Sequence, residues 1–64
     1  MRLTELWRRM DEALGAPAAD TFASDQVIGD LGDRTVREAL AAGVPAKEVW
    51  RVLCATLNLP ARLR

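Results

Sequence analysis

The segment from Thr35 to Leu57, TVREALAAGVPAKEVWRVLCATL, places the strongest constraint on how this chain folds. Thr35 and Glu38 precede an apolar run at the spacing of a helix capping box. Gly43 follows as a natural helix end, and Pro45 fits the first turn of a second, longer helix. The segment therefore predicts two helices joined by a tight glycine turn.

Both predicted helices carry an apolar face at helical spacing. The inward face of the first helix is formed by Val36, Ala39 and Leu40, and that of the second by Val49, Trp50, Leu53, Cys54 and Leu57. We expect Trp50 to turn inward, so that the last helix serves first as scaffold. Pro60 is predicted to end this helix, leaving residues 60–64 as a loose basic tail.

The start of the chain predicts a further amphipathic helix. Its apolar residues recur at helical spacing, namely Leu3, Leu6, Trp7, Met10, Ala13 and Leu14. Thr4 is the predicted N-cap, and Gly15 is the predicted stop.

The region Ala18–Leu31 gives a weaker helical signal. We expect two short helices, or one helix with a break near Ser24, with Pro17 suited to the first helical position. Ser24 or Asp25 could cap the second of these helices.

The length and composition limit the chain to one small domain. The sequence has 64 residues, 50% of them hydrophobic, and its single cysteine cannot form an internal disulfide, so packing alone must hold the fold. We predict an all-α, compact single-domain bundle over residues 1–64, with four helices, or five if Ala18–Leu31 is split. The predicted core consists of Trp7, Met10, Leu14, Phe22, Ile28, Leu31, Val36, Leu40, Trp50, Leu53 and Leu57.

Charge is balanced overall but uneven along the chain. Residues 1–33 carry three basic and seven acidic side chains, a net charge of −4, whereas residues 34–64 carry six basic and two acidic ones, a net charge of +4. Such asymmetry can mark a surface that binds polyanions. The favoured interpretation is that the opposite halves attract each other within the fold or pair in a dimer.

The residue types argue against catalysis and against cofactor binding. Histidine and tyrosine are absent, which removes the usual general base and the commonest metal ligand. Cys54 lies mid-helix and is expected to be a small core residue. Asp25, Asp30 and Asp33 lack the spacing of a calcium loop, and the glycines form no phosphate-binding pattern. We therefore expect no enzyme activity, no cofactor, no metal and no small-molecule substrate.

The spacing around Gly43 also resembles a helix-turn-helix motif. Ala39 falls where such motifs need a small residue, and Val44, Val49 and Val52 fall at their buried positions. In that interpretation the DNA-binding residues are Lys47 and Arg51, with Arg34 or Arg37 on phosphates. Against it, the spacing places Trp50 in the core, and few outward polar groups remain to read bases.

The chain resembles a family of short actinobacterial proteins catalogued as domain of unknown function 3046. The resemblance covers the whole chain and rests on four strings: MRLTELWRRM from Met1, RTVREALAAG from Arg34, VWRVLC from Val49 and PARLR from Pro60. It implies no activity, cofactor or site residue. Members of that family are often encoded near recombination genes, which implies at most a loose link to DNA maintenance. Val44-Pro45 departs from the family, since an acidic residue is expected there, and leaves the last helix without an obvious capping side chain.

Two hypotheses for function follow. The first is a non-enzymatic interaction or regulatory module that contacts an unknown protein partner or a second copy of itself. The alternative is a helix-turn-helix DNA-binding protein. No apolar run is long enough to span a bilayer and no signal peptide opens the chain, so we expect a cytoplasmic protein with no membrane partner.

Overall fold

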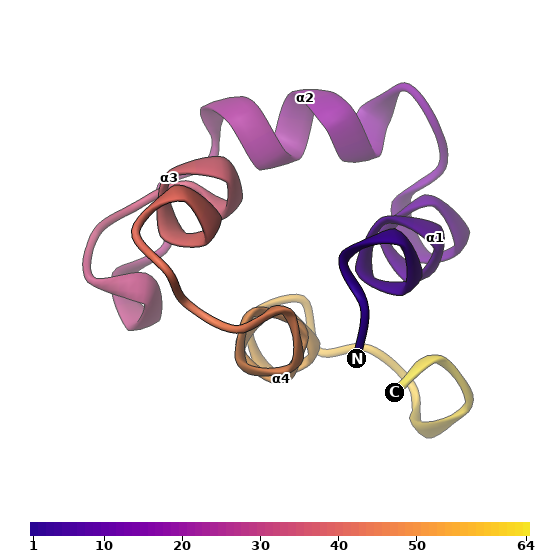
Figure 1. Ribbon diagram of the computed structural model, residues 1–64. Coiled ribbons are helices and arrows are strands. Elements are labelled where there is room, and N and C mark those ends of the chain that lie inside the picture. The colour runs from indigo at the N-terminus through magenta and orange to yellow at the C-terminus, as the bar shows by residue number, and fades with distance from the viewer.

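The computed structural model describes residues 1–64 and contains four α-helices and two short 3₁₀ turns. In chain order these are α1 (Leu3–Leu14), α2 (Ala18–Asp25), η1 (Gly29–Leu31), α3 (Val36–Ala41), α4 (Ala46–Thr56) and η2 (Ala61–Leu63). In Figure 1 the four helices surround a common core, with α2 across the top, α1 and α3 at the sides and α4 below. The prediction of a small all-α domain with four helices is therefore confirmed.

Helix α1 starts at Leu3, two residues before the start that a Thr4 cap would give. The carbonyl of Arg2 accepts the N–H groups of Glu5 and Leu6 at 3.0 and 3.1 Å, and no side chain caps the helix. The prediction of Thr4 as N-cap is wrong, because the backbone of Arg2 already supplies the first acceptor. Gly15 ends the helix as predicted, with a φ of +79° and its N–H bonded to the carbonyl of Asp11.

The region Ala18–Leu31 forms two short helical elements rather than one. Pro17 is the N-cap of α2 and not its first helical residue, and neither Ser24 nor Asp25 caps a new helix. Instead, the chain leaves α2 in an extended conformation, and the Ile28 N–H donates to the carbonyl of Arg34 at 3.0 Å. This isolated bridge encloses η1, which is a single 3₁₀ turn.

The segment α3–turn–α4 follows the sequence prediction closely. Thr35 accepts the Glu38 N–H at 3.1 Å while the Glu38 carboxylate accepts the Thr35 N–H at 2.9 Å, which confirms the capping box. Gly43 has a φ of +97°, a conformation that side chains disfavour, and it turns the chain so that the Val44 N–H reaches the carbonyl of Ala39. Pro45 is the N-cap of α4, without a side-chain hydrogen bond.

The core is built from thirteen buried hydrophobic residues. Trp50 is only 5% exposed, so its predicted inward orientation is confirmed. Of the other predicted core residues, Met10, Ile28, Leu31, Val36 and Leu53 are buried, and the half-buried ones that pack against the core are Trp7, Leu14, Phe22 and Leu40. Residues buried in addition to the predicted set are Leu6, Ala19, Ala23, Ala39, Val49, Val52 and Cys54.

The C-terminal end of α4 differs from the prediction. Helix α4 stops at Thr56, before Pro60, because Asn58 adopts a positive φ of 52° and the Leu59 N–H turns back to the carbonyl of Cys54. This reversal packs Leu59 against the core in place of the predicted Leu57.

Residues 60–64 are not a loose tail. They include η2 (Ala61–Leu63), which contacts α1, and the Arg64 Nε donates to the carbonyl of Leu59 at 3.0 Å. None of the helices has the length and apolar character needed to cross a membrane.

Candidate functional site

One groove is open on the surface, and its lining combines basic and apolar side chains. It has a volume of about 770 Å³ and lies where α1, the start of the chain, α4 and the C-terminal residues meet. Its charged lining residues are Arg9, Lys47, Glu48, Arg51 and Arg64. Its other lining residues are Met1, Pro45, Trp50, Cys54 and Ala55. We call this site the basic groove, because four cations there face a single carboxylate.

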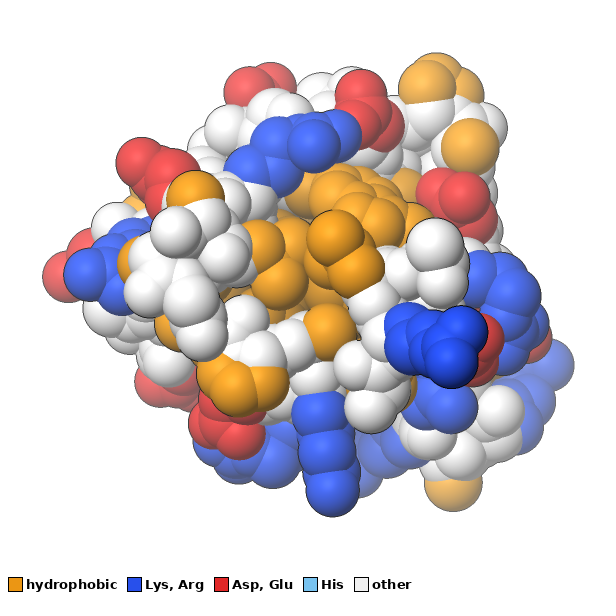
Figure 2. All heavy atoms as spheres, in the orientation of Figure 1, with side chains coloured by type: hydrophobic (Ala, Val, Ile, Leu, Met, Phe, Trp, Pro, Cys, Tyr) orange, Lys and Arg blue, Asp and Glu red, His pale blue; other side chains and the backbone are white.

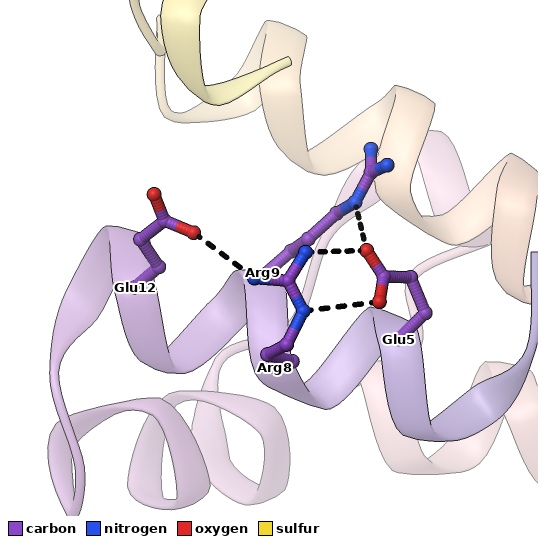
Figure 3. Close-up of polar contacts among 4 residues, drawn as sticks. All are labelled: Glu5, Arg8, Arg9 and Glu12. Carbon is purple, nitrogen blue, oxygen red and sulfur yellow. Dashed lines mark hydrogen bonds and ion pairs between the residues drawn. The ribbon is translucent and has the colours of Figure 1, made fainter.

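Arg9 is held at the groove by a network of charges on α1. Figure 3 shows Glu5 between two guanidinium groups, with Arg9 extending toward α4. Glu5 accepts from Arg8 at 2.6 Å and from Arg9 at 3.0 Å, while Arg8 also pairs with Glu12 at 3.5 Å. The hydrogen bonds from Arg8 and Arg9 lower the pKa of Glu5 from 4.5 to about 2. Glu5 therefore stays ionised and offsets part of the charge of Arg9.

A second local pair offsets another groove cation. Arg51 donates through Nε to the Glu48 carboxylate at 3.0 Å and pairs with it through a second nitrogen. The hydrogen bond to Arg51 lowers the pKa of Glu48, and the same bond raises the pKa of Arg51. Lys47 and Arg64, by contrast, form no ion pair, so they are the groove cations with charge left to bind a ligand.

Trp50 and Cys54 contribute buried groups to the lining of the groove. The Trp50 indole N–H is buried and has no hydrogen-bond acceptor, although buried indole N–H groups usually find one. A buried donor left without a partner typically costs about 1–3 kcal/mol.

The thiol of Cys54 is free and buried. Burial raises its pKa, against a smaller lowering by the charges of Arg64 and Arg9. No local spacing predicted these two neighbouring cations. The outcome still agrees with the expected role of Cys54 as a core residue.

A second surface, the apolar patch, lies beside the groove. Hydrophobic side chains at the start of α1, at the end of α3 and around the start of α4 are only partly covered, and they comprise Leu3, Trp7, Leu40, Val44 and Ala46. Figure 2 shows hydrophobic side chains gathered in the middle of the face between these helix ends. Leu3 is 52% exposed, although its spacing places it on the inward face of α1. The patch and the groove share one stretch of chain, since the groove residue Pro45 lies between Val44 and Ala46 in the sequence.

Arg37 covers one edge of the apolar patch. Its guanidinium lies 4.8 Å from the centre of the Trp7 ring, and it also bonds to Ser24 at 2.9 Å and pairs with Asp20. This is the one ion pair that joins the acidic half of the chain to the basic half, since the other four lie within α1 or α4. The predicted attraction between the halves is thus limited to a single pair.

The four residues of the DNA-binding hypothesis are not brought together. Lys47 and Arg51 both line the basic groove. Arg37 instead binds side chains of α2, and Arg34 lies at the bridge with Ile28, before α3. Sequence reasoning missed Arg9 and Arg64, which complete the groove. Arg9 lies far from α4 in the sequence, and Arg64 comes to α4 only through the chain reversal after Thr56.

The acidic residues considered as a cation site are exposed, and Asp25, Asp30 and Asp33 form no cluster suited to a metal ion.

Comparisons with curated proteins and with solved structures give no match. A comparison with protein families matches residues 1–62 to the family described as "Protein of unknown function (DUF3046)". The chain therefore belongs to the DUF3046 family.

Proposed function

We propose that this protein is a non-enzymatic interaction module that acts through contacts with another protein. The observation that carries the proposal is the apolar patch, which remains partly exposed in the middle of one face (Figure 2). Contiguous exposed hydrophobic surface on a small soluble fold is a common feature of protein-binding sites. Two half-buried residues of the patch, Trp7 and Leu40, also belong to helices that already pack against the core, so the patch is rigid before a partner binds.

The arrangement of basic residues gives less support to DNA binding. A helix that reads the major groove needs outward side chains free to contact bases and phosphates. Here Arg51 of α4 pairs with Glu48, and Arg37 of α3 pairs with Asp20. Trp50, which also belongs to α4, is buried. The neutral net charge also gives little long-range attraction for a polyanion.

A pair of matched variants tests the proposal. Leu3 is 52% exposed and belongs to the apolar patch, whereas Val27 is 54% exposed and lies in the extended segment after α2. Leu3→Asp and Val27→Asp make the same kind of change at equal exposure, so both should preserve the fold. The wild type and both variants are used to capture proteins from native lysate, and each is sized in solution.

We expect a partner, or a self-associated form, that persists in Val27→Asp and is lost in Leu3→Asp. A monomeric wild type that captures nothing would contradict the proposal. Fluorescence polarisation of labelled duplex DNA across a salt series tests the DNA-binding hypothesis. Salt-dependent binding of DNA that Leu3→Asp leaves unchanged would favour that hypothesis over the proposed one.

A further inference from the structure

The basic groove differs in its chemistry from the apolar patch. Four cations and one carboxylate surround a surface that includes the side chains of Met1, Trp50, Cys54 and Ala55. A ligand that fits such a site must combine negative charge with apolar groups. We propose that the groove binds an acidic peptide segment of the partner protein, with an apolar side chain seated against Trp50 and carboxylates directed to Lys47 and Arg64.

The distribution of charge at the groove supports an acidic ligand. Arg51 and Arg9 are already paired, with Glu48 and Glu5 respectively, and they contribute little to binding. Lys47 has no ion pair, and Arg64 uses only its Nε, in the hydrogen bond to the carbonyl of Leu59. Two cations that line the groove therefore remain with unfilled donor positions, one on α4 and one directly after η2.

The Trp50 indole supports a ligand with backbone or carboxylate oxygens. Its N–H is buried at 5% residue exposure and has no acceptor, and the ring lines the groove. A peptide offers such an oxygen at every residue. Tryptophan is also the residue most often found at the energetic centre of a protein interface.

The position of the groove favours a peptide over other anions. Pro45 lines the groove and lies between the patch residues Val44 and Ala46 in the sequence, so the two surfaces share this stretch of chain. A nucleic-acid backbone supplies phosphates but no apolar group to cover Trp50. The proposal rests on the interaction function described above, and it names the chemistry of the partner.

The test uses the full chain as bait for a displayed library of random short peptides. Lys47→Glu reverses a groove cation, and Arg34→Glu is the matched control, since Arg34 is also exposed, forms no ion pair and lies outside the groove. We expect enriched peptides that combine acidic residues with an aromatic or aliphatic one. Their affinity should fall about tenfold in Lys47→Glu and stay unchanged in Arg34→Glu. Lys47→Gln, with a smaller loss, serves as the variant of choice should the reversal disturb the fold.

A spectroscopic measurement locates the bound peptide. In Trp7→Phe the only remaining tryptophan is Trp50, and its emission should shift when an enriched peptide binds. Peptides that bind Lys47→Glu as well as the wild type, or that leave Trp50 emission unchanged, would overturn the proposal while leaving the interaction function intact. Enrichment of purely apolar peptides would do the same. Duplex DNA that binds more tightly than any peptide and is sensitive to Lys47→Glu would overturn both.

Discussion

Replacing Trp50 by phenylalanine tests the unpaired indole directly. Phenylalanine keeps most of the buried ring but removes the N–H that has no acceptor. The smaller side chain leaves a void of roughly 40 Å³, which costs ~1 kcal/mol at about 24 cal/mol per Å³. The lost transfer free energy of the removed apolar atoms adds roughly 1 kcal/mol. Removing an unsatisfied buried donor returns about 1–3 kcal/mol. We therefore expect the free energy of unfolding of Trp50→Phe to lie within ~1 kcal/mol of the wild-type value.

Urea unfolding followed by far-UV circular dichroism measures this difference, because the helical signal does not depend on the tryptophan removed. Trp50→Ala provides the scale, since deleting the whole side chain should cost about 3–5 kcal/mol. That loss is comparable to the total stability of a domain of this size, roughly 3–10 kcal/mol. Trp7→Phe is the matched control, and it should lose about 0.5–1 kcal/mol because its ring binds the Arg37 guanidinium. A loss above ~2 kcal/mol in Trp50→Phe would refute the reasoning, since it would mean that the indole N–H has an acceptor in solution.

Three further outcomes are expected. Thr35→Ala should lower the free energy of unfolding by ~1 kcal/mol, because the Glu38 N–H loses its cap, and thermal unfolding against Thr56→Ala as control measures the loss. The lowered pKa of Glu5 means that its carboxylate stabilises the fold above pH 4.5 and that this stability is lost as the pH falls toward about 2. The stability of Glu5→Gln should therefore fall less over that range, and equal slopes would contradict the assignment. Cys54 should react with a thiol reagent more slowly than free cysteine until urea unfolds the chain, because burial raises its pKa.

The sequence pattern correctly predicted the elements whose hydrogen bonds join residues only a few positions apart. The Thr35–Glu38 capping box, the stops at Gly15 and Gly43, and the inward face of α4 all depend on spacing along one helix or turn. The same reasoning failed at Thr4, where two backbone N–H groups bond to Arg2 instead. A capping residue indicates that a helix starts nearby, but the competing backbone acceptor decides at which residue.

The candidate site was predicted less well than the fold. Lys47 and Arg51 were identified because they share one helix, and both do line the basic groove. Their grouping with Arg34 and Arg37 is not seen, because Arg37 turns to Asp20 and the Trp7 ring instead. Contacts between residues on different helices depend on how the helices pack, and the sequence pattern of one helix carries no information on that.

By itself, the sequence determined that this chain is a small all-α domain with Trp50 turned inward, because helical periodicity fixes which side of each helix is apolar. Only the tertiary structure decided which polar and partly exposed apolar side chains lie together on the surface. It brought Arg9 and Arg64 to α4 to form the basic groove, and it left the apolar patch partly uncovered between the ends of α1, α3 and α4. The physical reason is that residue spacing along one helix determines which of its faces is apolar. A surface shared by several helices exists only once those helices have packed together.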